Sequence, residues 1–422
     1  MNLKKNILAA ALSVGLVGSA CAASGNVTYI SGSTAFGSSS MAALTNWVSS
    51  HGGALLAYDA NPVTGGKHAL LSYTNGGTNY IAVTLNGSET GVQSAAGPAN
   101  SASNAAKVSF YATTNTGLST SYPVSHTADL AFSDTYQSTS IFNGRVNGVS
   151  YSTLSGYDSG DGIVGVVAFT WAGSKGFPTN GNITAQVANQ ILAAGNVPLT
   201  LITGSASDST NSAYLVGRNV DSGTRLTTLA ETTYGVRTPV TQYAVATGYS
   251  GGGGSTATLS NTSTTNTLIL YPVETIDGIS STTAGNSGYS SGGTLCGLLT
   301  NSYAQGAGLT VAGVAARSTG TNFLIGYAGV GDANGKVSGG LVKLAYDGVF
   351  CSTNAIAQGQ YTFWGYEHLF VSPNANTEAQ FVANTIGTQI AGTPTSTLDP
   401  NVNVTDMQCG RNGDGTIVYS NY

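Results

Sequence analysis

The sequence predicts an α/β fold in which a mixed sheet is flanked by helices. Strand patterns alternate with helical patterns along the chain, and loops of small residues connect each strand to the next helix. Apolar residues make up 41% of the 422 residues, which is enough to bury a core. Charged residues reach only 7%, and 13 basic against 18 acidic residues disfavour binding to nucleic acid.

The first predicted unit is a strand followed by a helix. Residues 27–30 predict a short strand, and the small-residue segment 31–36 leads into a helical pattern that stops at Gly52 and Gly53. One face of this helix carries four apolar side chains: Met41, Leu44, Trp47 and Val48. The helix therefore begins directly after the end of the strand.

The same order of strand, small-residue loop and helix recurs at two later places. Residues 80–85 alternate like a strand and precede the loop 86–91. Residues 215–217 predict another strand, which is followed by the loop 218–224 and a helix that Gly235 closes. The apolar face of that helix comprises Leu226, Leu229, Ala230 and Tyr234.

A further amphipathic helix is predicted in the middle of the chain. Ile183, Val187 and Ile191 follow helical spacing, with Asn182 as the expected N-cap and Gly195 just after the end. Strands that alternate with such helices indicate an α/β sheet rather than an all-β fold.

Several polar segments are predicted as surface loops or turns. The stretches 94–120 and 248–267 are rich in Ser, Gly, Thr, Asn and Ala, which indicates long surface loops or irregular hairpins inserted into the α/β framework. Residues 248–252 match the Gly-x-Ser-x-Gly hydrolase pattern but lack a strand before and a helix after, so we interpret the match as chance. The fragments 158–162 and 412–415 resemble parts of calcium loops and are better explained as turns.

Residues 1–22 have the form of a secretory signal peptide. Two lysines precede an apolar run at 7–17, and small residues surround Cys21. The run is too short to span a bilayer. Export to the periplasm or the cell surface is expected, and acylation of Cys21 is a less favoured alternative because Gly18 stands where lipoprotein signals usually carry Leu.

The remaining cysteines are Cys296, Cys351 and Cys409. An oxidising compartment could pair two of them, and the sequence leaves the choice open. Their spacing suits no zinc site and the four histidines are scattered, so neither a metal site nor another cofactor is predicted.

The strand-to-helix loops carry the groups that an oxyanion needs. Unpaired backbone N–H groups at a helix start favour negative charge, Ser and Thr hydroxyls add neutral donors, and glycine lets the backbone come close. Arg218 lies four residues before Ser222 and six before Thr224. One loop can therefore present a guanidinium and a hydroxyl cluster to the same anion.

Four segments in sequence order resemble the periplasmic phosphate-binding proteins of ABC transporters. The segments are Gly32-Ser33-Thr34-Ala35-Phe36, Gly87-Ser88-Glu89-Thr90-Gly91-Val92-Gln93, Phe132-Ser133-Asp134 and Arg218 through Thr224. Two later segments, 323–327 and 344–361, are also similar to that family, so the resemblance spans most of the mature chain. It implies the following ligand-binding residues: Thr34, Ala35, Phe36, Ser88, Asp134, Arg218, Ser222, Gly223 and Thr224.

The resemblance also implies a two-lobed periplasmic-binding-protein fold of type II. Residues 23–138 plus 345–422 would form lobe 1, and residues 139–344 would form lobe 2. The implied function is capture of inorganic phosphate, or arsenate, between the lobes by an exported monomer that is not an enzyme. An ABC transporter permease or a membrane sensor would be its partner.

Two features bear on ligand choice. Val220-Asp221 stands where the family carries Asp-Gly, which removes a carboxylate expected to pair with the arginine. An ionised Asp134 can only accept hydrogen bonds, so it suits a protonated anion such as hydrogen phosphate and disfavours sulfate.

Two other functions remain as alternatives to capture of phosphate. A structural or adhesive surface protein that keeps the fold is suggested by the low charge and the long Ser/Gly-rich insertions. A phosphatase with Ser222 as nucleophile is disfavoured because neither a metal cluster nor a general base accompanies it.

Overall fold

The computed structural model describes residues 26–61, 66–98, 107–247, 258–259, 266–276, 279–301, 309–311, 320–392 and 402–420. The predicted signal peptide, with Cys21, lies outside the described residues, as does most of the 248–267 insertion. In the described part, no helix is both long enough and apolar enough to cross a membrane.

A 13-stranded mixed sheet forms the centre of the molecule. Its strands are β1 (Val27–Gly32), β2 (Ala54–Tyr58), β3 (His68–Thr74), β4 (Thr78–Thr84), β6 (Gly117–Leu118), β8 (Leu130–Ser133), β11 (Ser155–Gly156), β12 (Ile163–Gly173), β14 (Asn196–Pro198), β15 (Ser212–Leu215), β22 (Asn322–Gly329), β23 (Val342–Lys343) and β25 (Trp364–Val371). The spatial order is β14-β15-β22-β12-β25-β8-β1-β4-β3-β2-β6, with β11 on β25 and β23 on β12. The prediction of a mixed sheet flanked by helices is confirmed.

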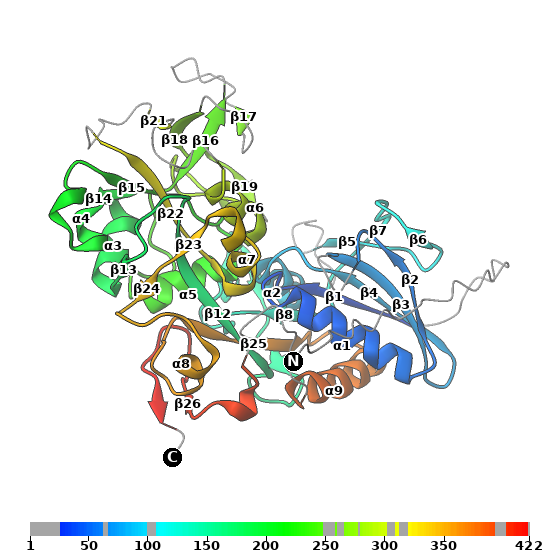
Figure 1. Cartoon of the computed structure of the whole chain (residues 1–422). Helices are drawn as coiled ribbons and strands as arrows, with labels where there is room; N and C mark the ends of the chain where they lie inside the picture. The colour runs from blue at the N-terminus through cyan, green and yellow to red at the C-terminus, as the bar shows by residue number, and fades with distance from the viewer. Residues whose placement is uncertain are drawn as a thin grey trace, which may run out of the picture.

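Strand β12 belongs to two parts of this sheet. Its first residues, Ile163–Ala168, pair with β25, and its last residues, Phe169–Gly173, pair with β22. We call β25, β8, β1, β4, β3, β2 and β6 the β1 half, and β22, β15 and β14 the β22 half. Figure 1 shows β12 and β25 running between these two groups of elements.

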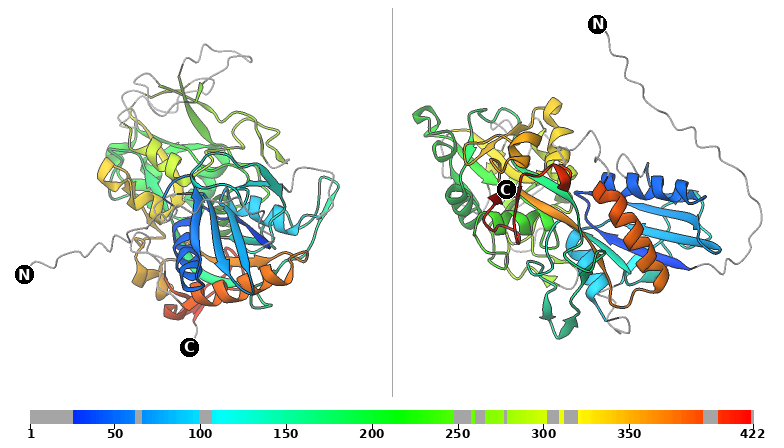
Figure 2. Two further views of the ribbon diagram at one scale, coloured as in Figure 1. Left: turned by 90° about the vertical axis from the view of Figure 1, so that its right-hand side faces the viewer. Right: turned by 90° about the horizontal axis from the view of Figure 1, so that it is seen from below.

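Helices cover both faces of each half because alternate strand residues point to opposite sides. In the β1 half, Leu130 and Phe132 of β8 pack on the side of α1 (Gly37–Ser50) and α9 (Thr377–Gly392), which lie against each other (Figure 2). Ala131 instead packs with α2 (Ser88–Ala96). In the β22 half, α3 (Ala185–Ala194) and α6 (Gly292–Leu299) cover opposite faces.

Shorter elements complete the described fold. The other helices are α4 (Thr200–Thr203), α5 (Gly223–Glu231), α7 (Val330–Asn334) and α8 (Thr353–Ala357). Small sheets pair β5 (Val108–Phe110) with β7 (Val124–His126), β9 (Gly144–Val146) with β10 (Val149–Tyr151), β13 (Asn182–Ile183) with β24 (Ala345–Tyr346), β19 (Thr275–Ile276) with β20 (Ile279–Ser280), and β26 (Cys409–Gly410) with β27 (Tyr419–Ser420). A further sheet has the order β17 (Thr258–Leu259), β16 (Tyr243–Thr247), β18 (Asn266–Leu270) and β21 (Leu309–Val311).

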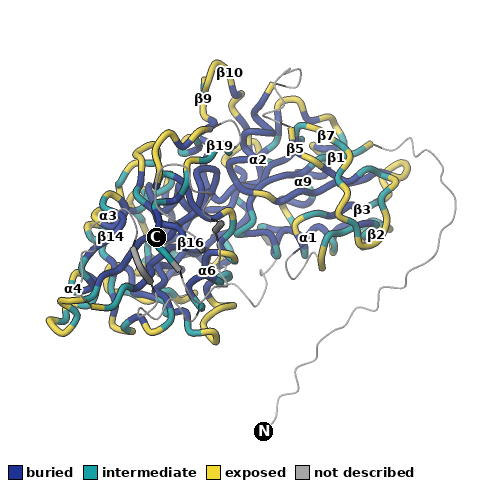
Figure 3. Tube along the Cα trace, turned by 90° about the horizontal axis from the view of Figure 1, so that it is seen from above, coloured by how far each residue is buried: buried dark blue, intermediate teal, exposed yellow. Residues whose placement is uncertain are grey.

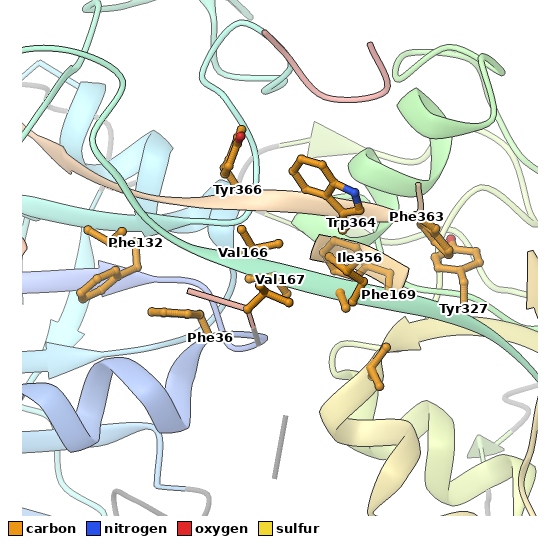
Figure 4. Close-up of a cluster of buried hydrophobic side chains, with 14 of the residues drawn as sticks. Phe36, Phe132, Val166, Val167, Phe169, Tyr327, Ile356, Phe363, Trp364 and Tyr366 are labelled. Carbon is orange, nitrogen blue, oxygen red and sulfur yellow. The ribbon is translucent and has the colours of Figure 1, made fainter. Parts of the chain in front are cut away.

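The largest core continues from one half of the sheet to the other. Figure 3 shows that the interior of both halves is buried, whereas exposed backbone lies at loop tips. In Figure 4, Phe36 and Phe132 lie toward one end of this core and Tyr327 toward the other, with Val167 and Phe169 between them. Strand β12 therefore lies within a continuous apolar core.

Most predicted elements are confirmed, and three details are corrected. The N-cap of α3 is Thr184, whose Oγ1 accepts the Val187 N–H at 3.2 Å, because Asn182 is already in β13. Helix α5 ends at Glu231 rather than near Tyr234. The stretch 94–120 begins inside a helix, since α2 extends to Ala96, whereas the short antiparallel strands from Val108 agree with the irregular hairpins expected there. Cys296, Cys351 and Cys409 are all free thiols.

Candidate functional site

Three parallel strands bring separate loops to one edge of the sheet. β1 pairs in parallel with both β4 and β8, so their carboxyl ends lie side by side. The segment before α1, the segment before α2, and Asp134 directly follow these three ends. In open α/β sheets, ligands bind at such an edge.

Ser88 and Asp134 meet there, although 46 residues separate them in sequence. The Ser88 hydroxyl donates a hydrogen bond to Oδ1 of Asp134, and the Asp134 N–H points back at Ser88 Oγ at 3.4 Å. Gly87 holds the start of α2 with φ at 138°, a conformation that disfavours any side chain. Both polar side chains are buried.

The N-terminus of α5 faces the same carboxylate. Ser222 caps this helix by accepting the Arg225 N–H at 3.3 Å. A Cβ at Gly223 would collide with Oδ1 of Asp134 and lie 2.6 Å from Ser88 Oγ, so only glycine fits. A loop of the β22 half and two loops of the β1 half thus converge on Asp134.

Arg218 is buried beside this cluster and contacts only neutral acceptors. Its Nε donates to the Tyr289 carbonyl at 3.1 Å, its Nη2 to the Ser290 carbonyl at 3.2 Å, and its Nη1 approaches Thr224 Oγ1 at 3.4 Å. Among the described residues, no carboxylate oxygen lies within 4.0 Å of its guanidinium. A buried cation that has no carboxylate within contact distance is stabilised by an anion that binds next to it.

Thr34 and Ala35 lie at a cavity of about 350 Å³ between the two halves. The β1 half contributes Thr34, Ala35 and Lys67, and the β22 half contributes Ser291, Gly292 and Asp332. Phe36 differs from its neighbours, because its ring is fully buried in the core (Figure 4) and its N–H donates to Ser33 Oγ at 3.3 Å. The Phe36 ring therefore cannot reach a ligand in the cavity.

The cavity adjoins Arg218. A Cβ at Gly292 would lie 3.5 Å from Arg218 Nη1 and 2.0 Å from Asp332 Oδ2. Gly292 and Gly293 begin α6, where Ser291 accepts the Thr294 N–H at 3.1 Å. Gly292 thus brings one wall of the cavity, at the positive end of a helix dipole, near the Arg218 guanidinium.

Burial shifts the acid–base behaviour of the carboxyl groups around the cluster. Burial raises the pKa of Asp134, and the Ser88 hydrogen bond and the Arg218 charge offset part of that rise. Glu89, which accepts from the Ser140 hydroxyl at 2.7 Å and the Ile141 N–H at 2.9 Å, has its pKa raised by burial to about 8. Burial and, secondly, the charge of Asp134 raise the pKa of Glu367 well above its ordinary value. These groups carry less negative charge near neutral pH than their number implies.

The sequence interpretation did not include Glu89, Glu367 or Asp332. Glu89 directly follows a predicted ligand, and Glu367 lies in an aromatic strand between Tyr366 and His368. An acidic residue within an apolar strand is unusual in a chain with few charges, so the sequence alone could have indicated that Glu367 belongs to the candidate functional site. For Asp332 the sequence carries no such signal, because only tertiary packing brings it to Arg218.

Comparison with solved structures gives distant likenesses. A candidate phosphate ABC transporter substrate-binding protein from Clostridium perfringens, solved with bound phosphate, is 12% identical; the match covers 87% of this chain and 96% of that one, with a TM-score of 0.42. An ABC-type phosphate transport receptor from Vibrio cholerae is also 12% identical, with 86% and 93% covered and a TM-score of 0.38. PstS from Borrelia burgdorferi is 11% identical, with 85% and 92% covered and a TM-score of 0.36.

These three structures carry names from the class of protein that the sequence motifs resemble. No protein-family model and no curated protein matches the sequence.

Proposed function

We propose that the protein is a non-catalytic receptor that captures inorganic phosphate between the β1 half and the β22 half. The observation that carries this proposal is Arg218, a buried guanidinium whose three described partners are all neutral. Arginine matches the geometry of phosphate oxygens, and a buried cation is stabilised by an anion that it can contact. Thr224, Ser88 and the start of α5 add neutral donors around it.

Asp134 would determine which anions this site selects. When ionised, its carboxylate accepts a proton-bearing ligand oxygen, so hydrogen phosphate and hydrogen arsenate are favoured over sulfate. Sulfate offers no proton at neutral pH and would leave the buried carboxylate facing a like charge. Asp134 is therefore the proposed selectivity residue, and Arg218 the proposed charge partner.

We take the two halves as the centres of the two proposed lobes. We infer lobe 1 from residues 23–138 plus 345–422 and lobe 2 from 139–344, with closure around the ligand. Residues 1–22 would direct export to the periplasm or the cell surface, where an ABC transporter permease or a membrane sensor would recognise the closed form of a monomer.

Titration calorimetry with phosphate, arsenate and sulfate tests the proposal. We expect the mature chain to bind phosphate and arsenate and to reject sulfate. Arg218→Ala should weaken phosphate binding by at least about 100-fold, because a charge-assisted bidentate contact is lost. Absence of both heat and a thermal shift with phosphate, from a chain whose circular dichroism shows it folded, would refute the proposal.

One observation favours the structural alternative. The Ser88 hydroxyl and the start of α5 already have a carboxylate against them, that of Asp134. In a structural or adhesive protein, this contact would join the two halves without any ligand. Under that alternative, Asp134→Asn lowers stability and no anion changes the unfolding temperature.

A further inference from the structure

The cavity between the halves is large compared with the proposed ligand. Its volume of about 350 Å³ corresponds to roughly twelve water molecules at ~30 Å³ each. A tetrahedral anion with five non-hydrogen atoms replaces about two or three waters of that volume. The volume exceeds that of inorganic phosphate and falls in the range found for small-molecule pockets.

One wall residue of the cavity lies close to the proposed anion position. Gly292 lines the cavity, and a Cβ there would lie 3.5 Å from Arg218 Nη1. On the opposite side, a Cβ at Gly329 would lie 3.9 Å from Ala35 Cβ. The space bounded by both halves therefore lies next to Arg218.

The walls of this space suit hydroxyl groups. Six of the described lining residues are glycines, which present backbone groups rather than side chains. Asp332 contributes a carboxylate, and no described residue donates a hydrogen bond to it. Burial raises the pKa of Asp332, and the charges of Arg218, Lys67 and Lys336 offset part of that rise. The carboxylate can accept a hydrogen bond from an alcohol. The partly apolar wall, with Leu85 and Val330, matches the carbon face of a polyol.

We propose that the cavity binds the organic part of a phosphate monoester of a small polyol, with the phosphoryl group at Arg218 and hydroxyls on Asp332. This inference rests on the proposed function, since it uses the same anion position. It changes the ligand class from inorganic phosphate alone to polyol phosphates as well.

Calorimetry of the mature chain with inorganic phosphate and with glycerol 3-phosphate tests the inference. We expect glycerol 3-phosphate to bind at least as tightly as phosphate. Asp332→Asn should lower the ratio of ester to phosphate affinity by about tenfold, the effect of one hydrogen bond to a charged group.

A pair of variants in α6 provides the steric test. At Gly293, which lines the cavity, a Cβ would meet only Asp332 Oδ1 at 3.4 Å, so Gly293→Leu fills the cavity without a backbone clash. Gly297 lies one turn further along α6, with nothing within 4 Å of an added Cβ. Gly293→Leu should lower the affinity ratio at least tenfold, whereas Gly297→Leu should leave it unchanged.

The outcomes separate the two proposals. If phosphate binds and glycerol 3-phosphate does not, the inference fails and the proposed function stands. If neither binds to a folded chain, the proposed function fails and the inference fails with it. Equal affinity ratios in Gly293→Leu, Gly297→Leu and the wild-type chain would also overturn the inference.

Discussion

Two buried arginines, Arg218 and Arg411, have opposite surroundings. Arg411 Nη1 donates to Glu231 Oε2 at 2.9 Å and to the Trp364 carbonyl at 2.9 Å, and its guanidinium lies 4.2 Å from the centre of the Trp364 ring. Arg218 contacts two carbonyls and a hydroxyl, with no carboxylate within 4.0 Å in the described chain. Arg411 thus has a hydrogen-bonded counterion, whereas Arg218 has no carboxylate oxygen within 4.0 Å in the described chain and interacts with Asp134 and Asp332 at longer range.

The largest expected effect on stability comes from breaking the ion pair between Arg411 and Glu231. Arg411→Met should lower the free energy of unfolding by about 3–5 kcal/mol, because it leaves the buried Glu231 carboxylate unpaired. Chemical denaturation of the mature chain measures the loss. Adding Glu231→Gln should restore part of it, since the second change removes the orphaned charge.

Arg218→Met sharpens the comparison. It breaks no ion pair, so its loss of stability should be less than half that of Arg411→Met in the same denaturation experiment. Equal losses would show that Arg218 is as structural as Arg411 and would contradict the contrast between the two regions.

The pH dependence of stability probes the carboxyl group nearest the anion cluster. Burial raises the pKa of Glu89 from 4.5 to about 8, so the folded state favours its neutral form. That stabilisation is complete below the unfolded pKa and is lost as pH rises through about 8. We expect the free energy of unfolding to fall between ~pH 5 and ~pH 8, by at most about 1.4 kcal/mol per pH unit for this one group, and to level off above that range.

Glu89→Gln isolates that contribution. Asp414, whose pKa burial raises to about 7, adds a slope of the same sign, so the variant should flatten the profile without abolishing it. Superimposable profiles for variant and wild type would show that Glu89 titrates normally.

The smallest expected effect compares two helix caps. Ser222 and Ser352 each accept a backbone N–H at the start of a helix, at 3.3 and 3.1 Å. Ser222→Ala and Ser352→Ala should each cost about 1 kcal/mol of stability. Only Ser222→Ala should also weaken phosphate binding, and a matching loss in Ser352→Ala would assign the effect to general destabilisation.

The sequence predicted the strand-loop-helix units because their patterns are local. β1, α1, β4, α2 and α5 follow from apolar spacing and from loops of small residues. Parallel pairing then brings Ser88 to Asp134, and glycine at 223 allows the contact. Their role as ligands stays a prediction.

What the sequence could not provide depends on tertiary packing. Asp332 comes near Arg218, with no ion-pair contact within 4.0 Å, only through the folding of the β22 half. The Phe36 ring enters the core although its neighbours face the cavity. The raised pKa of Glu89 comes from burial by segments far away in sequence. The N-cap of α3 is Thr184 because β13 pairs with β24 through Asn182, a contact between residues 163 positions apart.

Because β12 pairs with both β25 and β22, the stabilities of the two halves of the sheet are coupled. A single strand supplies backbone hydrogen bonds to both parts of the sheet, so neither part keeps its full ladder if the other melts. The free energies of the two parts are therefore shared rather than independent. A ligand that stabilises one half of the sheet against unfolding therefore also makes the other half more resistant to heat and to proteases, without contacting it.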